Sequence, residues 1–146
     1  MKVEFHSGVQ DKLSHACRFL RKAQAAQAKV VVCGEAALLD RLDVTLWTFD
    51  ALSFVAHVRL RAGQARRPGW SRTPTWLVDA AASAPAAQIL VNLGPDLAPG
   101  WQGFERVVEI VEQEPGDSLA GRRRWREYAT HPGIELVHHA LGGPPA

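Results

Sequence analysis

The chain has 146 residues, of which 47% are hydrophobic, a size and composition typical of one domain with one buried core. Its 17 Lys and Arg against 15 Asp and Glu give a formal charge of +2, too balanced for a protein that holds nucleic acid by bulk electrostatics. Without an apolar run of about 18 residues or a secretory leader pattern, the sequence predicts a cytoplasmic protein. We expect a single domain over residues 1–141 and a flexible tail over 142–146.

Strand and helix patterns alternate along the first half of the chain. A short strand is expected over residues 3–5, followed by a helix that Asp11 caps. Three consecutive valines at 30–32 are typical of a parallel strand buried on both faces, and helical spacing resumes over 35–46. Residues 61–75, rich in Arg, Gly and Pro, have the composition of a mobile surface loop.

The second half repeats this alternation. Asp117 is expected to cap a helix that runs to residue 128 or 129. Further strands are expected over 75–78, 89–93, 106–111 and 134–139. The sequence therefore predicts an α/β protein, a three-layer α/β/α sandwich around a largely parallel, Rossmann-like sheet.

Patterns that carry catalysis or hold a cofactor are missing from the sequence. The expected first strand-to-helix loop, residues 6–10, has one glycine and no lysine, so it lacks the means to cradle phosphate. Cys17 and Cys33 have no zinc-ligand spacing and are expected to be reduced core thiols. His138 and His139 point to opposite faces of a strand, so they cannot hold one metal ion together. We expect no cofactor, no metal and no enzymatic activity.

The segment 46–55 places four large apolar side chains at the end of a helix. They are Trp47, Phe49, Leu52 and Phe54. Trp and Phe commonly anchor protein interfaces, but the same residues could equally close the core over the sheet.

The segment 117–128 combines arginines with aromatic residues. On a helix, Leu119, Arg122, Trp125 and Tyr128 step by three and are expected to share one face. An arginine among apolar neighbours suits an acidic peptide or a terminal carboxylate, because its planar fork pairs with carboxylates. Equally, Arg122 could pair with an internal acid: Glu109, Glu112 or Glu114.

These segments also resemble the chi subunit family of bacterial DNA polymerase III. The similar blocks run in the family's order along nearly the whole chain. They are Leu42 with Leu-Trp-Thr-Phe-Asp at 46–50, residues 52–55 and His57, Thr-Pro at 73–74, Trp-Leu-Val-Asp at 76–79, Val-Asn-Leu-Gly at 91–94, residues 104–111, and Arg-Arg-Arg-Trp at 122–125 with Tyr128. The chain departs from the family at Ala51 and Ala56, where prolines are common, and at Ala129, where a basic residue is usual.

The resemblance implies a non-catalytic accessory subunit with an α/β fold. It would pair with the psi subunit, attach in this way to the clamp loader, and bind the acidic C-terminal tail of the single-stranded-DNA-binding protein. The implied tail-binding residues are Val111, Arg122, Arg124, Trp125 and Tyr128, and the implied psi-facing residues are Trp47 and Phe54. DNA would be contacted only indirectly.

Two other functions remain open at this stage. One is a small Rossmann-like enzyme that uses a histidine or cysteine on a phosphorylated or nucleotide substrate. The other is direct binding of single-stranded nucleic acid through the arginines of 61–72 and the basic helix, where Trp125 and Tyr128 would stack on bases.

Overall fold

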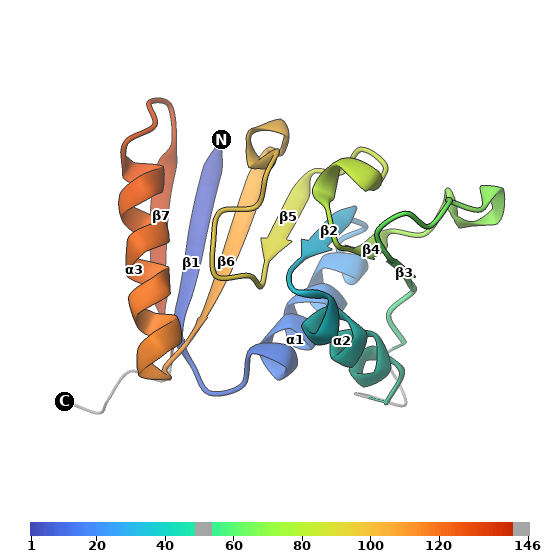
Figure 1. The fold of residues 1–146 in the computed structure, drawn as a ribbon, viewed down its shortest axis with the longest axis horizontal. Helices are drawn as coiled ribbons and strands as arrows, with labels where there is room; N and C mark the ends of the chain where they lie inside the picture. Colours follow the sequence, from blue (N-terminus) through green and yellow to red (C-terminus); the bar gives the residue numbers. More distant parts are fainter. Residues whose placement is uncertain (49–53, 142–146) are drawn as a thin grey trace.

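The computed structural model describes residues 1–48 and 54–141. Within them, seven strands form one sheet in the order β3-β4-β2-β5-β6-β1-β7 (Figure 1). Every pair of neighbours is parallel, so the predicted α/β class is confirmed and the sheet is wholly rather than largely parallel. The strands are β1 (Lys2–Val9), β2 (Val30–Cys33), β3 (His57–Leu60), β4 (Thr75–Val78), β5 (Ile89–Asn92), β6 (Arg106–Glu112) and β7 (Glu135–Ala140).

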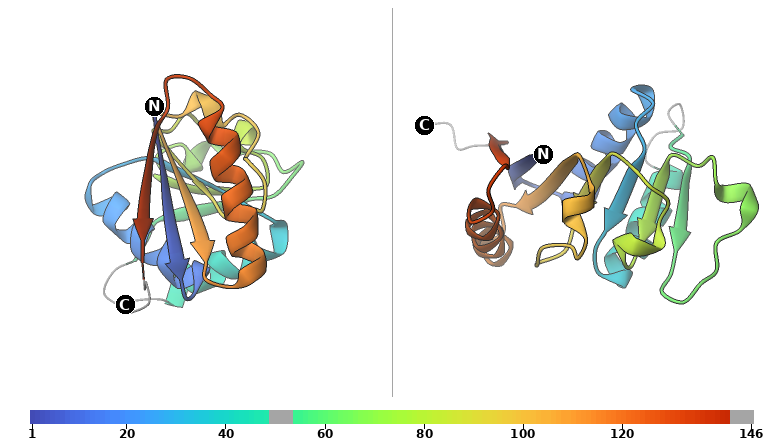
Figure 2. Two further views of the ribbon diagram at one scale, coloured as in Figure 1. Left: turned by 90° about the vertical axis from the view of Figure 1, so that its left-hand side faces the viewer. Right: turned by 90° about the horizontal axis from the view of Figure 1, so that it is seen from above.

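Helices cover both faces of this sheet, as the predicted three-layer sandwich requires. They are α1 (Lys12–Ala25), α2 (Ala36–Thr48) and α3 (Pro115–Ala129). Figure 2 (left) shows α1 and α3 on opposite sides of the sheet. The consecutive valines of β2 divide between two cores, with Val30 and Val32 packed on the side of α1 and α2 and Val31 packed on the side of α3. A strand buried on both faces needs this unbroken apolar run.

Strand β1 is longer than expected. Residues 6–9, predicted to form a loop, extend the strand because β6 and β7 pair with it on either side. The register shifts between His6 and Val9, and Gly8 there has a φ of 70°. A Cβ on Gly8 would lie 2.1 Å from the carbonyl oxygen of Leu141, so only glycine fits this position.

Two further elements differ from the expected ones: helix α3 has a different cap, and strand β3 was not expected. Asp11 caps α1 as predicted, its carboxylate accepting from the backbone N–H of Leu13 at 3.1 Å. Helix α3 is capped by Glu114 instead of Asp117, and Asp117 in the first turn binds Lys12 of α1 at 3.1 Å. Strand β3 was not predicted, although its alternating half-buried and buried residues fit an edge strand.

The basic segment before β4 lies on the surface, as expected. Residues 61–69 are exposed, and Arg61 forms an ion pair with Asp40 of α2 at 2.7 Å. Phe49, Leu52 and the expected tail at 142–146 lie outside the described residues. In the described part of the chain, no helix has the length and apolarity needed to cross a membrane.

Candidate functional site

A buried carboxylate fixes helix α3 to the sheet. Glu109, at the centre of β6, has no exposed surface, and its Oε1 accepts a hydrogen bond from Arg124 Nε at 2.8 Å. Tyr128 donates its hydroxyl proton to Oε2 at 2.7 Å, and Asn92 of β5 donates to both oxygens. Burial raises the pKa of Glu109 above its usual value, and these donors oppose the rise because they stabilise the carboxylate form.

The buried face of α3 differs from the face that the sequence predicted. Leu119 is 56% exposed and Arg122 is exposed, whereas Tyr128 is fully buried. Each step of three residues falls about 60° short of a full turn, so the predicted stripe winds from solvent into the core. The residues packed against the sheet are Ala120, Gly121, Arg124 and Tyr128. The pairing with Glu109 considered for Arg122 is therefore made by Arg124.

A pocket of about 320 Å³ opens between α3 and the sheet, and we call it the α3 pocket. Its lining comes from α3, β1, β6 and β7: Phe5, Ser7, Val111, Ser118, Gly121, Arg122, Trp125 and His138. Phe5 and Trp125 meet edge to face with ring centroids 5.2 Å apart. The His138 ring lies 5.9 Å from that of Trp125, and the imidazole is hydrogen-bonded to the Ser7 hydroxyl.

Gly121 determines the depth of the α3 pocket. A Cβ at this position would lie 2.8 Å from Cγ1 of Val111, closer than side chains pack. The missing side chain allows α3 to approach β6 and leaves Val111 as part of the pocket wall. The pocket therefore depends on a glycine in the middle of a helix, where glycine is otherwise unfavourable.

Arg122 gives the α3 pocket its charge. Its side chain is exposed, and within residues 1–48 and 54–141 its guanidinium has no ion-pair partner. The walls beside it are apolar, formed by Phe5, Val111 and Trp125. An unpaired guanidinium next to an apolar cavity can bind a carboxylate whose neighbouring side chain enters the cavity.

Three of the five expected tail-binding residues meet in the α3 pocket, namely Val111, Arg122 and Trp125. Arg124 is only 2% exposed and Tyr128 is buried, and both are bound to Glu109 beneath the pocket. Sequence reasoning missed Phe5, Ser7 and His138, which reach the pocket from β1 and β7. Neighbouring strands far apart in the chain bring these residues together, and local spacing carries no sign of that pairing.

The other expected interface lies near the opposite edge of the sheet. Trp47 at the end of α2 is 62% exposed, and Phe54 before β3 is 50% exposed. Their rings lie 5.0 Å apart, and Val44, also exposed, precedes Trp47 by one helical turn. We call Val44, Trp47 and Phe54 the aromatic patch. Apolar side chains that lie together on the surface often mark a site of contact with another protein.

The two cysteines are buried, as the sequence predicted. Burial raises the pKa of Cys17 to about 11 and that of Cys33 to about 12, so both thiols stay protonated at neutral pH. Neither lines the α3 pocket.

The sequence also matches known proteins. It matches the family described as "DNA polymerase III chi subunit, HolC" over residues 1–136. The chain belongs to this family. A relative, the DNA polymerase III subunit chi of Pseudomonas aeruginosa, is 32% identical over 135 residues, which cover 89% of this chain and 87% of that protein. The chi family consists of accessory, not catalytic, subunits of DNA polymerase III, and its members act in DNA replication.

Proposed function

We propose that this chi family member is a replisome adaptor. It links the DNA polymerase III clamp loader, through the psi subunit, to the acidic C-terminal tail of the single-stranded-DNA-binding protein, and it works in the cytoplasm. In this proposal the α3 pocket receives the tail and the aromatic patch receives psi. DNA is reached only through the single-stranded-DNA-binding protein.

The tail assignment rests on Arg122, which borders apolar walls and has no ion-pair partner among the described residues. The terminal carboxylate of the tail pairs with Arg122, while an apolar terminal side chain packs against Val111 and Trp125. Acidic residues further along the tail meet Arg126, which is exposed on the same helix one turn after Arg122. Charge steers the tail to α3, and the apolar side chain fixes its register.

Arg124 and Tyr128 contribute to the proposed site indirectly, because they hold helix α3 in place. The guanidinium of Arg124 is already bound to Glu109 and to the carbonyl oxygen of Pro95 at 3.0 Å. The hydroxyl of Tyr128 is likewise committed to Glu109. Both residues therefore hold α3 in the place where Arg122 and Trp125 border the pocket.

Calorimetric titration with an acidic peptide that ends in an apolar residue tests the tail site. Arg122→Ala is expected to weaken binding at least about tenfold, because a hydrogen bond to a charged group contributes roughly 1.5–3 kcal/mol. A peptide with an amidated C-terminus should lose affinity to a similar degree. Binding should also weaken as salt rises, since exposed charges are screened over about 8 Å at physiological ionic strength.

Arg123→Ala is the matched control, because it removes the same charge from the neighbouring exposed position without touching the pocket. Its effect should be small beside that of Arg122→Ala. Equal losses in the two variants would point to diffuse attraction and contradict the pocket. Tight binding of bare single-stranded DNA by the isolated chain would favour a direct nucleic-acid role instead.

Co-elution with psi in size-exclusion chromatography tests the aromatic patch. Trp47→Ala is expected to abolish the complex and to leave the thermal midpoint nearly unchanged, because the side chain is mostly exposed. Leu119→Ala removes an exposed apolar side chain from α3 and should leave the complex intact. An unaltered complex in Trp47→Ala would place the psi surface elsewhere.

A further inference from the structure

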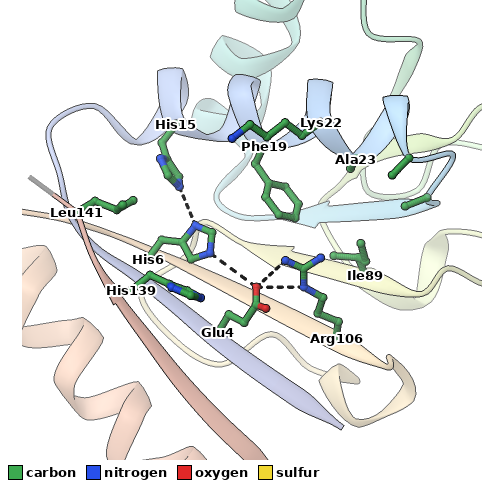
Figure 3. A pocket seen from close by; sticks show the side chains of 12 residues that line it. Glu4, His6, His15, Phe19, Lys22, Ala23, Ile89, Arg106, His139 and Leu141 are labelled. Atoms are coloured by element: carbon green, nitrogen blue, oxygen red, sulfur yellow. Dashed lines mark hydrogen bonds and ion pairs between the residues drawn. The ribbon is translucent and has the colours of Figure 1, made fainter.

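A second pocket, of about 460 Å³, lies on the face of the sheet that α1 covers (Figure 3). We call it the histidine pocket. One glutamate and three histidines line it, namely Glu4, His6, His15 and His139. Phe19 and Arg106 also belong to the lining. The chi family assignment and the proposed adaptor surfaces make no use of these side chains.

The strand register explains why three of these groups converge. Glu4 and His6 are two residues apart on β1, so they point to the same face. His6 is paired with His139 on the parallel neighbour β7, which places the His139 side chain beside it. His138, the preceding residue, faces the α3 pocket on the other side, as the sequence predicted for adjacent histidines.

The donor atoms of Glu4, His6 and His139 lie close enough to share one ion. All three lie within 4.8 Å of one another, and His6 Nε2 is 3.7 Å from Glu4 Oε2. Bonds of about 2.0–2.2 Å to Zn²⁺ place two ligand atoms about 3–4 Å apart. Because His139 is exposed, its side chain has room to rotate toward the other two.

Neighbouring groups hold two of these side chains in orientation. His6 Nδ1 is hydrogen-bonded to His15 Nε2 at 2.8 Å, which leaves Nε2 of His6 directed toward Glu4 (Figure 3). Metal-bound histidines usually have their second ring nitrogen engaged in this way. Glu4 is held by Arg106 at 2.6 Å and by Lys2 at 3.2 Å, and both cations are partly exposed, so water can solvate them when an ion shares the carboxylate.

We propose that Glu4, His6 and His139 bind a divalent transition-metal ion of the Zn²⁺ class. Two imidazoles and one carboxylate favour Zn²⁺, Co²⁺ or Ni²⁺ over Mg²⁺ and Ca²⁺, which prefer oxygen ligands alone. Three protein ligands leave one coordination position open toward the pocket. The ion joins β7, an edge strand, to β1 and fixes the end of the sheet beside which the α3 pocket lies.

Calorimetric titration of untagged, chelator-treated protein with ZnCl₂ at pH 7.5 tests the site. We expect saturable binding of one ion by the unaltered chain and a rise in its thermal midpoint. His139→Asn should weaken the binding at least tenfold, and its exposed position means that the fold is retained. His131→Asn is the control, because it removes a histidine that packs beside Trp101, outside the histidine pocket, and its affinity should match the unaltered chain.

Titration with CoCl₂ gives a second reading that does not depend on stability. The visible absorption of bound Co²⁺ should appear in the unaltered chain and in His131→Asn, and should be lost in His139→Asn. Absence of saturable Zn²⁺ binding in the unaltered chain would overturn the proposal. Equal binding by His139→Asn and the unaltered chain would also overturn it.

Discussion

The carboxylate of Glu109 shows what an ionisable group in the core requires. Donors from β5 and α3 surround it, and Tyr128 keeps its proton because burial and the neighbouring carboxylate raise the pKa of its hydroxyl. A buried ion pair of this kind adds little net stability over an apolar pair. Removing one partner, however, leaves the other as an uncompensated buried charge, which is strongly destabilising. Glu109 and Arg124 therefore act as one unit.

Replacing one member of this pair tests that dependence. Glu109→Gln leaves the Arg124 guanidinium buried without a counter-charge, so we expect a loss of about 3–5 kcal/mol in the free energy of unfolding, measured by urea denaturation. Arg124→Met in the same chain should recover part of that loss. The exposed Glu105→Gln is the control and should change stability by less than about 0.5 kcal/mol. A Glu109→Gln variant as stable as its control would show that the pair is dispensable.

Glu109 also shows what could not be predicted from the sequence alone. An acid in the middle of the apolar run of β6 was a sign that a buried partner exists, but the partner is 15 residues away on α3. Spacing within α3 grouped Leu119, Arg122, Trp125 and Tyr128 on one face, but of these only Tyr128 is buried. The other buried positions of the helix are 120, 121 and 124. Local patterns describe one element and do not reveal which charge lies across from it.

At the scale of elements, the contact between α3 and β6 is set by a missing side chain. Gly121 allows the helix to pack with its backbone against Val111. Elements with strong periodicity or β-branched runs, such as α1 and β2, were predictable because burial on a known face leaves a regular pattern. Strand β3 was not, because four residues at a sheet edge carry too short a pattern to separate from a loop.

Gly121→Ala tests the close packing. The added methyl raises the intrinsic helix propensity but collides with Val111, so we expect a net loss of about 1–3 kcal/mol in the free energy of unfolding. The α3 pocket should also become shallower, with weaker binding of the acidic peptide. Ala at position 129, at the exposed end of α3, offers a comparison: Ala129→Gly should lose no more than about 1 kcal/mol. Increased stability in Gly121→Ala would show that the helix can move away without penalty.

At the scale of the whole molecule, the proposed partner surfaces lie near opposite edges of one sheet. The aromatic patch belongs to α2 and the segment before β3, and the α3 pocket borders β6, β1 and β7. Strands β4, β2 and β5 separate the two and are packed on both faces. Nothing in this arrangement makes one partner block the other.

Independent binding is therefore expected. The affinity of the acidic peptide for the chain saturated with psi should agree within about twofold with its affinity for the free chain, and both partners should be found together in one complex by analytical ultracentrifugation. A coupling free energy above about 1 kcal/mol would mean that the sheet transmits a change between its edges. Mutual exclusion would contradict an adaptor with two separate surfaces.

The attachment of α3 through its inner face also has a consequence for protein engineering. Arg124 and Tyr128 hold the helix from below, so the outward side chains Arg122, Arg123 and Arg126 carry little of the folding energy and are open to exchange. Reversing the charge at position 122 is then a route to a variant that recognises a basic peptide on an unaltered scaffold.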